Sequence, residues 1–191
     1  RWLSDRLKMK LIGAEEMRGK DLKGLGFEFY EELLGRFFDL LKATFGDRLI
    51  SLVLYGSVAR GEARENSDLD LLIILDGVSP NYHRRLDEVL EVQTCLESEQ
   101  VYEKITDALG IAPFLSYLIL SKEEANENRY IYLDMVEAVK ILYDQDGFFA
   151  KRLKKMKERL RELGSKRIQL KDGTWYWDLK PDLKSGEVFT L

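Results

Sequence analysis

Two aspartates, Asp68 and Asp70, stand two positions apart at the start of an apolar run that continues to Leu75. Such a run predicts a buried strand, and in a strand residues i and i+2 point to the same face. The two carboxylates then converge on one spot. Mg²⁺ prefers hard oxygen ligands of this kind and commonly takes one or two carboxylates together with waters and substrate phosphates. The pair is therefore a candidate metal site that could also hold a phosphorylated ligand.

A glycine-serine turn precedes this pair. Residues 50–55 form a shorter apolar run typical of a strand, and Gly56 ends it where the backbone favours glycine. If a helix begins there, the free N–H groups of Gly56 and Ser57 and the Ser57 hydroxyl can donate to phosphate oxygens. Each feature alone is common in ordinary turns. Their conjunction favours a function, because an acidic pair on a buried strand has a desolvation cost that packing does not explain.

The spacing of these groups resembles a known signature. Gly56-Ser57, ten further residues and then Asp68-x-Asp70 are similar to the motif of the nucleotidyltransferase superfamily typified by DNA polymerase β, and more closely to that of the minimal nucleotidyltransferases of prokaryotes. The resemblance implies that Gly56 and Ser57 bind the β- and γ-phosphates of ATP or another nucleoside triphosphate. It also implies that Asp68 and Asp70 are catalytic and hold one or two Mg²⁺ ions for in-line attack on the α-phosphorus, with pyrophosphate leaving.

The segment between the two halves of the motif adds further candidates. Arg60 and Ser67 extend the resemblance, and we include both among the candidate nucleotide-binding residues. The guanidinium groups of Arg60 and Arg64 could meet phosphate oxygens. They could equally pair with Glu62 and Glu65 at the surface, so the sequence leaves both alternatives open.

One part of the family's pattern is missing. The resemblance implies a third carboxylate on a following strand, where it helps to hold the metal or to activate the attacking hydroxyl. The candidate strand here, residues 111–120, contains no acidic residue. Ser116 could occupy the position, with Glu123, Glu124 or Asp134 reaching in from beyond, but none of them matches the pattern. A degenerate member that binds a nucleotide or a partner without transfer therefore stays open.

The predicted elements give an α/β (α+β) fold. Their order of helix, strand, helix-turn, strand, helix and strand predicts a small mixed sheet with helices packed on it. C-terminal helices and a β-hairpin tail follow. We divide the chain into an N-terminal helical extension (residues 1–26), a nucleotidyltransferase domain (27–122) and a C-terminal segment (123–191). The first helix of the domain has one broad apolar face, formed by Tyr30, Leu33, Leu34, Phe37, Phe38 and Leu41.

Three more helices and a hairpin are expected after the second strand. Residues 82–108 predict one helix, whose inward-facing residues are Leu86, Val89, Leu90, Leu96, Val101 and Ile105. Residues 122–143 predict a second. A third begins at Asp146 or Gly147, and its apolar stripe consists of Leu153, Met156, Leu160 and Leu163. Residues 168–181 predict a hairpin whose Trp175 and Trp177 share one face, which would cover a core, contact another copy of the chain in a homo-oligomer, or stack on a base.

Charge is concentrated in one segment. Residues 151–167 carry nine Lys or Arg against two Glu, although the whole chain has a net charge of −4. The plain interpretation is a solvated helix face. The sharper one is a surface for nucleic acid or for the phosphates of a nucleotide, and the acidic pI of about 5.3 argues against a broad nucleic-acid surface.

Composition sets the remaining limits. The chain has 191 residues, of which 45% are hydrophobic and 34% charged, so we expect one core with or without an appendage. No apolar run approaches the roughly 20 residues that span a bilayer, and charge stands where a signal peptide would be apolar, so a cytoplasmic location without membrane contact is expected. Cys95 alone cannot form an internal disulfide, and His83 alone cannot build a Cys/His zinc site.

These observations predict a Mg²⁺-dependent nucleotidyltransferase that moves a nucleoside monophosphate, AMP from ATP, onto a hydroxyl of a protein, an RNA or a small molecule. The resemblance implies one alternative, because minimal nucleotidyltransferases often act as the antitoxin partner of a HEPN-type ribonuclease. Such a partner could be modified or simply bound. A nucleic-acid-binding module that uses residues 151–167 is the third hypothesis.

Overall fold

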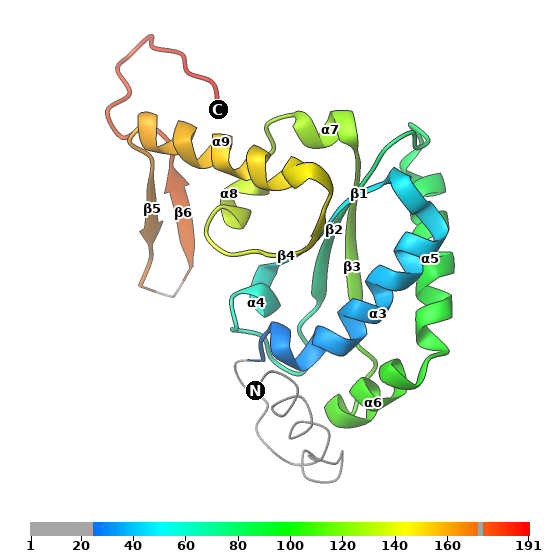
Figure 1. Ribbon diagram of the computed structural model, residues 1–191. Helices are drawn as coiled ribbons and strands as arrows, with labels where there is room; N and C mark the ends of the chain where they lie inside the picture. Colours follow the sequence, from blue (N-terminus) through cyan, green and yellow to red (C-terminus); the bar gives the residue numbers. More distant parts are fainter. Residues whose placement is uncertain (1–24, 172–173) are drawn as a thin grey trace, which may run out of the picture.

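A four-stranded mixed sheet lies at the centre of the computed structural model, which describes residues 25–171 and 174–191 (Figure 1). The strand order is β3-β2-β1-β4. β1 (Leu49–Tyr55) runs antiparallel to β2 (Leu69–Leu75) and to β4 (Lys140–Asp144), whereas β2 and β3 (Leu115–Ser121) are parallel. The predicted mixed sheet is confirmed. The helix expected near the N-terminus lies outside the described residues.

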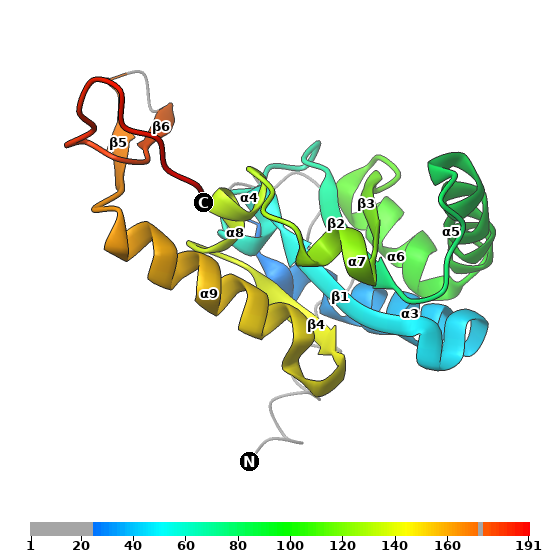
Figure 2. The same cartoon turned by 90° about the horizontal axis from the view of Figure 1, so that it is seen from above.

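Helices cover one face of the sheet with a continuous apolar core. α3 (Phe27–Phe45) packs there beside α5 (Tyr82–Glu97) and α6 (Gln100–Leu109) (Figure 2). α5 and α6 also form the crossover that a parallel pair such as β2 and β3 requires. The predicted apolar face of α3 is confirmed, since five of its six residues are buried and Phe38 packs at the edge of the core.

The single helix predicted over residues 82–108 is wrong. The chain breaks between α5 and α6 at Ser98 and Glu99, where Glu99 adopts an extended backbone. The Glu99 carboxylate accepts two hydrogen bonds from Arg36 on α3, at 2.7 and 2.9 Å. Leu90, which we expected to face inward, is 41% exposed. The break between the two helices thus carries a side-chain pairing with α3.

The other face of the sheet is covered by the C-terminal half of the chain. α7 (Lys122–Asn126), α8 (Tyr132–Met135) and α9 (Phe148–Glu162) form a second core with residues of β1 and β2. The apolar stripe predicted for the last helix is confirmed, because Leu153, Met156, Leu160 and Leu163 are all buried. The sheet thus lies between the two cores.

The helix predicted over residues 122–143 is also wrong. α7 ends at Asn126, α8 is a separate short helix, and the segment finishes as β4 on the edge of the sheet. A capping box between Ser121 and Glu124 starts α7, and pairing with β1 holds β4 extended. The division of the chain at residue 122 stays a prediction, although the fourth strand of the sheet lies beyond it.

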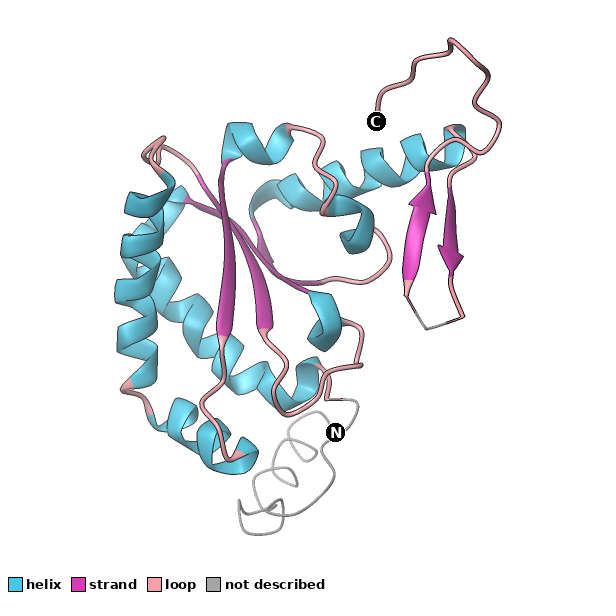
Figure 3. Cartoon of the chain, turned by 180° about the vertical axis from the view of Figure 1, so that it is seen from behind, coloured by secondary structure: helices cyan, strands magenta, loops and turns pink. Residues whose placement is uncertain are grey.

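The C-terminal hairpin stands apart from the central sheet (Figure 3). β5 (Lys166–Gln169) and β6 (Trp175–Asp178) pair antiparallel as predicted, and the middle of the expected turn lies outside the described residues. Trp177 packs against the second core, and the Arg167 guanidinium lies 4.3 Å from the Trp175 ring centroid. Within the described ranges, no helix is both long enough and apolar enough to cross a bilayer.

Candidate active site

The two halves of the glycine-serine and aspartate motif are in direct contact. Gly56 follows β1 with φ of +75°, a value that side chains disfavour. A Cβ atom built on Gly56 would lie 2.1 Å from Asp70 Oδ2. Glycine is therefore needed both for the backbone angle and for the space, and the turn backs directly onto the Asp70 carboxylate.

Neighbouring strands fix the position of Asp70. It lies on β2 opposite Tyr55 of β1 and opposite Ser116 of β3, on the face that the second core covers. Hydrogen bonding by the Ser116 side chain acts to lower the pKa of Asp70. Ser116 thus stands beside Asp70 on the third strand, at the position where the family resemblance implies an additional carboxylate.

The electrostatics of this spot favour a cation. Burial raises the pKa of Asp70 above its ordinary value, and the neighbouring Asp68 charge raises it further. The Ser116 hydrogen bond and the Arg60 charge offset only part of this rise. Because a divalent cation would relieve the repulsion between two carboxylates, the donor set fits a Mg²⁺ ion. Across the described residues, no group of three or more His, Cys, Asp or Glu could hold a metal ion, so Asp68 and Asp70 stand as a pair.

Arg60 and Ser67 make contacts in the segment between the motif halves. Arg60 Nε donates to Glu62 at 2.7 Å, which is the surface pairing that the sequence left open, yet the Arg60 charge still acts on Asp70. Ser67 Oγ accepts from the Arg64 amide at 2.9 Å and so closes the turn before β2. In the described part of the chain nothing hydrogen-bonds the half-buried Ser57 hydroxyl, which leaves it free for a ligand.

Three acidic residues beyond β3 were left open as candidates for the missing carboxylate, and of these Asp134 interacts with the charge of Arg60. α8 carries Asp134, and Arg60 directly follows α4 (Gly56–Ala59). Burial raises the pKa of Asp134, while the Arg60 and Arg167 charges lower it. Glu124 instead pairs with Arg85, and Glu123 accepts from Ser121.

Tyr55 is a residue of the site that was not predicted from the sequence. This residue ends β1 across from Asp70, and burial followed by the charges of Asp70 and Tyr82 raises the pKa of its hydroxyl to about 12. Its place as the last residue of β1, next to Gly56, was the available signal. A cavity of about 270 Å³ lies elsewhere, between α7 and α9. None of the motif residues lines it.

Comparisons with known proteins show the family of the chain. Residues 34–171 match the family model of the nucleotidyltransferase domain. The chain is 33% identical over 132 residues to a “Putative protein adenylyltransferase” of Methanocaldococcus jannaschii, which covers 69% of this chain and 83% of that protein.

Two solved structures are also similar. A “putative nucleotidyltransferase” from Sulfolobus solfataricus is 18% identical with a TM-score of 0.39, and the match covers 70% of this chain and 88% of that one. A “toxin-antitoxin with AMP-PNP” is 16% identical with the same TM-score, covering 68% and 90%.

Proposed function

The chain belongs to the nucleotidyltransferase domain family, and from this premise we propose that it transfers AMP from ATP to a hydroxyl group of a protein. The observation that carries the proposal is the contact between Gly56 and Asp70, because it unites the turn and the acidic pair in one site. The name of the M. jannaschii relative supports a protein acceptor.

Each residue of the site has a role in this proposal. The Gly56-Ser57 turn receives the triphosphate, since a bare glycine lets phosphate oxygens approach the backbone and the Ser57 hydroxyl is free to donate. Asp68 and Asp70 hold Mg²⁺, which when bound neutralises phosphate charge and polarises the phosphoryl group. Arg60 adds positive charge beside the pair. Ser67 keeps the turn before β2 closed, so that both carboxylates stay in place.

The test is the transfer of label from ATP labelled at the α-phosphate. The natural protein, with Mg²⁺, is incubated with candidate acceptor proteins and with RNA, and is compared with Asp68→Asn/Asp70→Asn. Asp87→Asn, an exposed carboxylate on α5, is the matched control. We expect labelled protein with the natural chain and the control, and a loss on the order of 1000-fold in the double variant, because metal ligands are removed. Labelled RNA instead of protein would change the acceptor class.

A second candidate function rests on Ser116. Because a serine faces Asp70 and the described residues include no third acid at the pair, the protein could bind a nucleotide or a partner protein, such as a HEPN-type ribonuclease, without transfer. In that case the labelling experiment gives no product although ATP binds.

The substitution Ser116→Asp distinguishes the two candidates. It places a third carboxylate next to Asp70, and we expect Mg²⁺ to bind about tenfold more tightly, as judged by calorimetry. If the natural protein is inactive and Ser116→Asp gains transfer, the chain is a degenerate member of its family. If the natural protein is active and the substitution slows it, Ser116 is part of a working site.

A further inference from the structure

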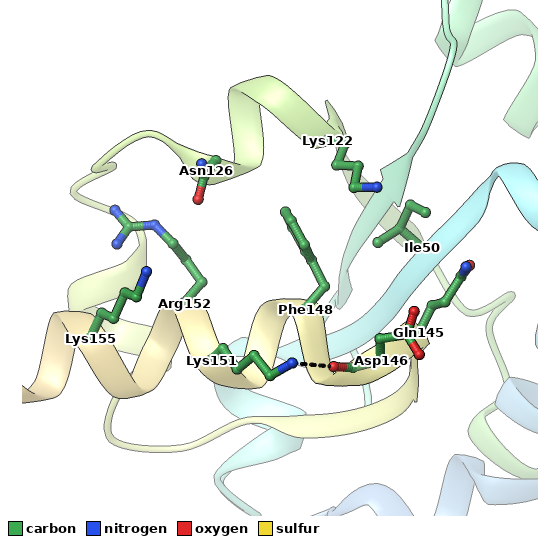
Figure 4. Close-up of a pocket in the computed structure, with 9 residues that line it drawn as sticks. All are labelled: Ile50, Lys122, Asn126, Gln145, Asp146, Phe148, Lys151, Arg152 and Lys155. Atoms are coloured by element: carbon green, nitrogen blue, oxygen red, sulfur yellow. Dashed lines mark hydrogen bonds between the residues drawn. The ribbon is translucent and has the colours of Figure 1, made fainter.

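A pocket of about 270 Å³ lies between α7 and α9, at the end of β1 away from the motif (Figure 4). Ile50 of β1 and Phe148 of α9 contribute apolar walls. Ile50 is the second residue of β1, whereas Gly56 follows its last, so the strand of seven residues separates the pocket from the candidate active site. A strand of that length spans about 20 Å. The pocket is therefore a separate place on the molecule.

The lining of this pocket is strongly cationic. Four positively charged side chains and one carboxylate surround it: Lys122, Lys151, Arg152, Lys155 and Asp146. Lys122 has a partner in Asp76 at 3.5 Å, and Lys151 donates to the backbone carbonyl of Asp146 at 2.8 Å. In the described ranges, Arg152 and Lys155 form no ion pair with any carboxylate. Two cations thus remain without a counter-ion inside one concave site.

Arg152 gives the strongest evidence for a ligand. Its side chain is only 9% exposed, yet its hydrogen-bond partner in the described chain is the neutral Asn128 side chain, and its Nε atom is buried without a partner. Arg85, which is 3% exposed, is paired with Glu124. The Arg152 guanidinium lies 5.9 Å from the centroid of the Tyr132 ring, which offers a weaker attraction than a carboxylate, so the two arginines differ in what they require. Arg152 lacks an anion.

The positive charge comes from side chains rather than from the start of α9. The amides of Phe149 and Ala150 already donate to the Asp144 carboxylate at 2.9 and 3.0 Å, and Ser51 donates to the same carboxylate. A ligand would therefore be held by guanidinium and ammonium groups, which form charge-assisted hydrogen bonds to phosphate oxygens.

The end of the pocket opposite Arg152 suits a different chemical group. Gln145 lies across the pocket from Arg152, with Phe148 between them (Figure 4). Its Oε1 atom is buried and, within the described chain, accepts no hydrogen bond. A buried acceptor of this kind is satisfied by a hydroxyl group. The pocket thus offers the Arg152 and Lys155 cations at one end, an apolar wall in the middle and, at the other end, the Gln145 acceptor beside Lys122.

We propose that this pocket binds a small phosphorylated molecule that carries a hydroxyl group, with its phosphate at Arg152 and Lys155. The volume is just below the usual range for drug-sized ligands, which fits a compact molecule rather than a whole polymer. The site is independent of the ATP that the proposed transfer consumes.

The experiment is calorimetric titration of the full chain without Mg²⁺, at fixed ionic strength, with ribose 5-phosphate, inorganic phosphate and unphosphorylated ribose. We expect ribose 5-phosphate to bind more tightly than phosphate, and ribose not to bind. Arg152→Gln/Lys155→Gln should weaken ribose 5-phosphate by at least about tenfold, since each charge-assisted contact is worth about 1.5–3 kcal/mol. Lys154→Gln/Lys157→Gln, which removes the same charge from the exposed side of α9, should leave binding within about twofold.

Further variants separate this pocket from the candidate active site and from the basic surface of α9. Asp68→Asn/Asp70→Asn should bind ribose 5-phosphate as the natural chain does, whether or not the proposed transfer is correct. Because Arg152 is buried, Lys155→Gln alone provides a weaker variant whose fold is expected to persist, and thermal melting checks both. The proposal fails if neither phosphate compound binds or if the two double variants lose affinity equally. It also fails if single-stranded RNA binds more tightly than ribose 5-phosphate and depends equally on Lys154 and Lys157.

Discussion

The two ends of the central sheet carry opposite charges that form no ion pair among the described residues. At the motif end, Asp70 is half-buried against Gly56, and Asp68 adds a second negative charge. At the far end, Arg152 and Lys155 lie in a pocket with no carboxylate paired to either among the described residues. Both ends belong to the same face of the sheet and share the second core.

The opposite charges at the two ends of the sheet indicate which ligand each end can bind. A half-buried Asp70 beside the exposed Asp68 fits a metal ion and the phosphates that come with it, whereas a buried guanidinium fits an anion directly. The contrast also separates function from stability, because Arg85 shows how the same chain neutralises a buried arginine when no ligand is involved.

The largest effect on activity is expected from Gly56→Ala, which changes only the motif end of the sheet. The new Cβ would lie 2.1 Å from Asp70 Oδ2 at a φ of +75°, so either the turn or the carboxylate must move. We expect AMP transfer to fall on the order of 100-fold, because a misplacement of about 1 Å at a reacting site has effects of this size. Steady-state labelling kinetics measure the loss.

Gly77→Ala is the matched control for this substitution. Gly77 also has a positive φ, of +60°, but no atom lies within 4 Å of the place that its new Cβ would occupy. The same backbone strain is thus introduced without the collision. If both substitutions slow transfer equally, the contact between Gly56 and Asp70 is not what matters, and the two ends of the sheet differ less than we infer.

Local patterns were enough to find the motif end. Gly56, Asp68 and Asp70 lie within fifteen residues of sequence, and a strand-turn-strand pattern is sufficient to bring them together. Ser116 required more, because its place beside Asp70 depends on the parallel pairing of β2 with β3 across a two-helix crossover. The sequence indicated Ser116 as a candidate, and the register between β2 and β3 places it beside Asp70.

The far end could not be derived in the same way. Arg152 was counted with a solvated helix face, although it stands three residues after Phe149 and four before Met156, on the buried side of α9. The contribution of α7 to the pocket wall could not be predicted, because a single helix was wrongly predicted over residues 122–143. Strand β4 was missed because its pairing with β1, and not its own sequence, keeps it extended. Non-local contacts decide all of these features.

A smaller effect is expected from Glu124→Gln, which acts on the wall of the far pocket. Glu124 of α7 pairs with the buried Arg85 and is itself 36% exposed. Removing its charge should lower the free energy of unfolding by about 2–3 kcal/mol, somewhat less than for a fully buried pair. Glu127→Gln, whose carboxylate is 69% exposed beside Arg129, should cost less than about 1 kcal/mol. Urea denaturation at neutral pH compares the two.

The pH dependence of the same variant tests the cause. The Arg85 hydrogen bond lowers the pKa of Glu124 from 4.5 to about 2. A depressed carboxyl pKa contributes stability above the unfolded value, and this contribution is lost as the pH falls through the folded value. The difference between the natural chain and Glu124→Gln should therefore shrink between pH 4.5 and about 2. A difference that does not change with pH would mean that packing, and not charge, holds α7 in place.

The smallest effect is expected from Asp70→Asn on the stability of the metal-free protein, and its sign is opposite. Burial and Asp68 raise the pKa of Asp70, so the folded state binds a proton more readily than the unfolded state. The charged carboxylate therefore destabilises the fold at neutral pH, and Asp70→Asn should raise the melting temperature there. The gain should disappear as the pH falls through the raised pKa to the ordinary value of 3.8, and also when Mg²⁺ stabilises the natural chain. An Asp70→Asn variant that is less stable at neutral pH would show that Asp70 supports the fold, and the motif end would then resemble the Arg85 pair rather than a site awaiting a cation.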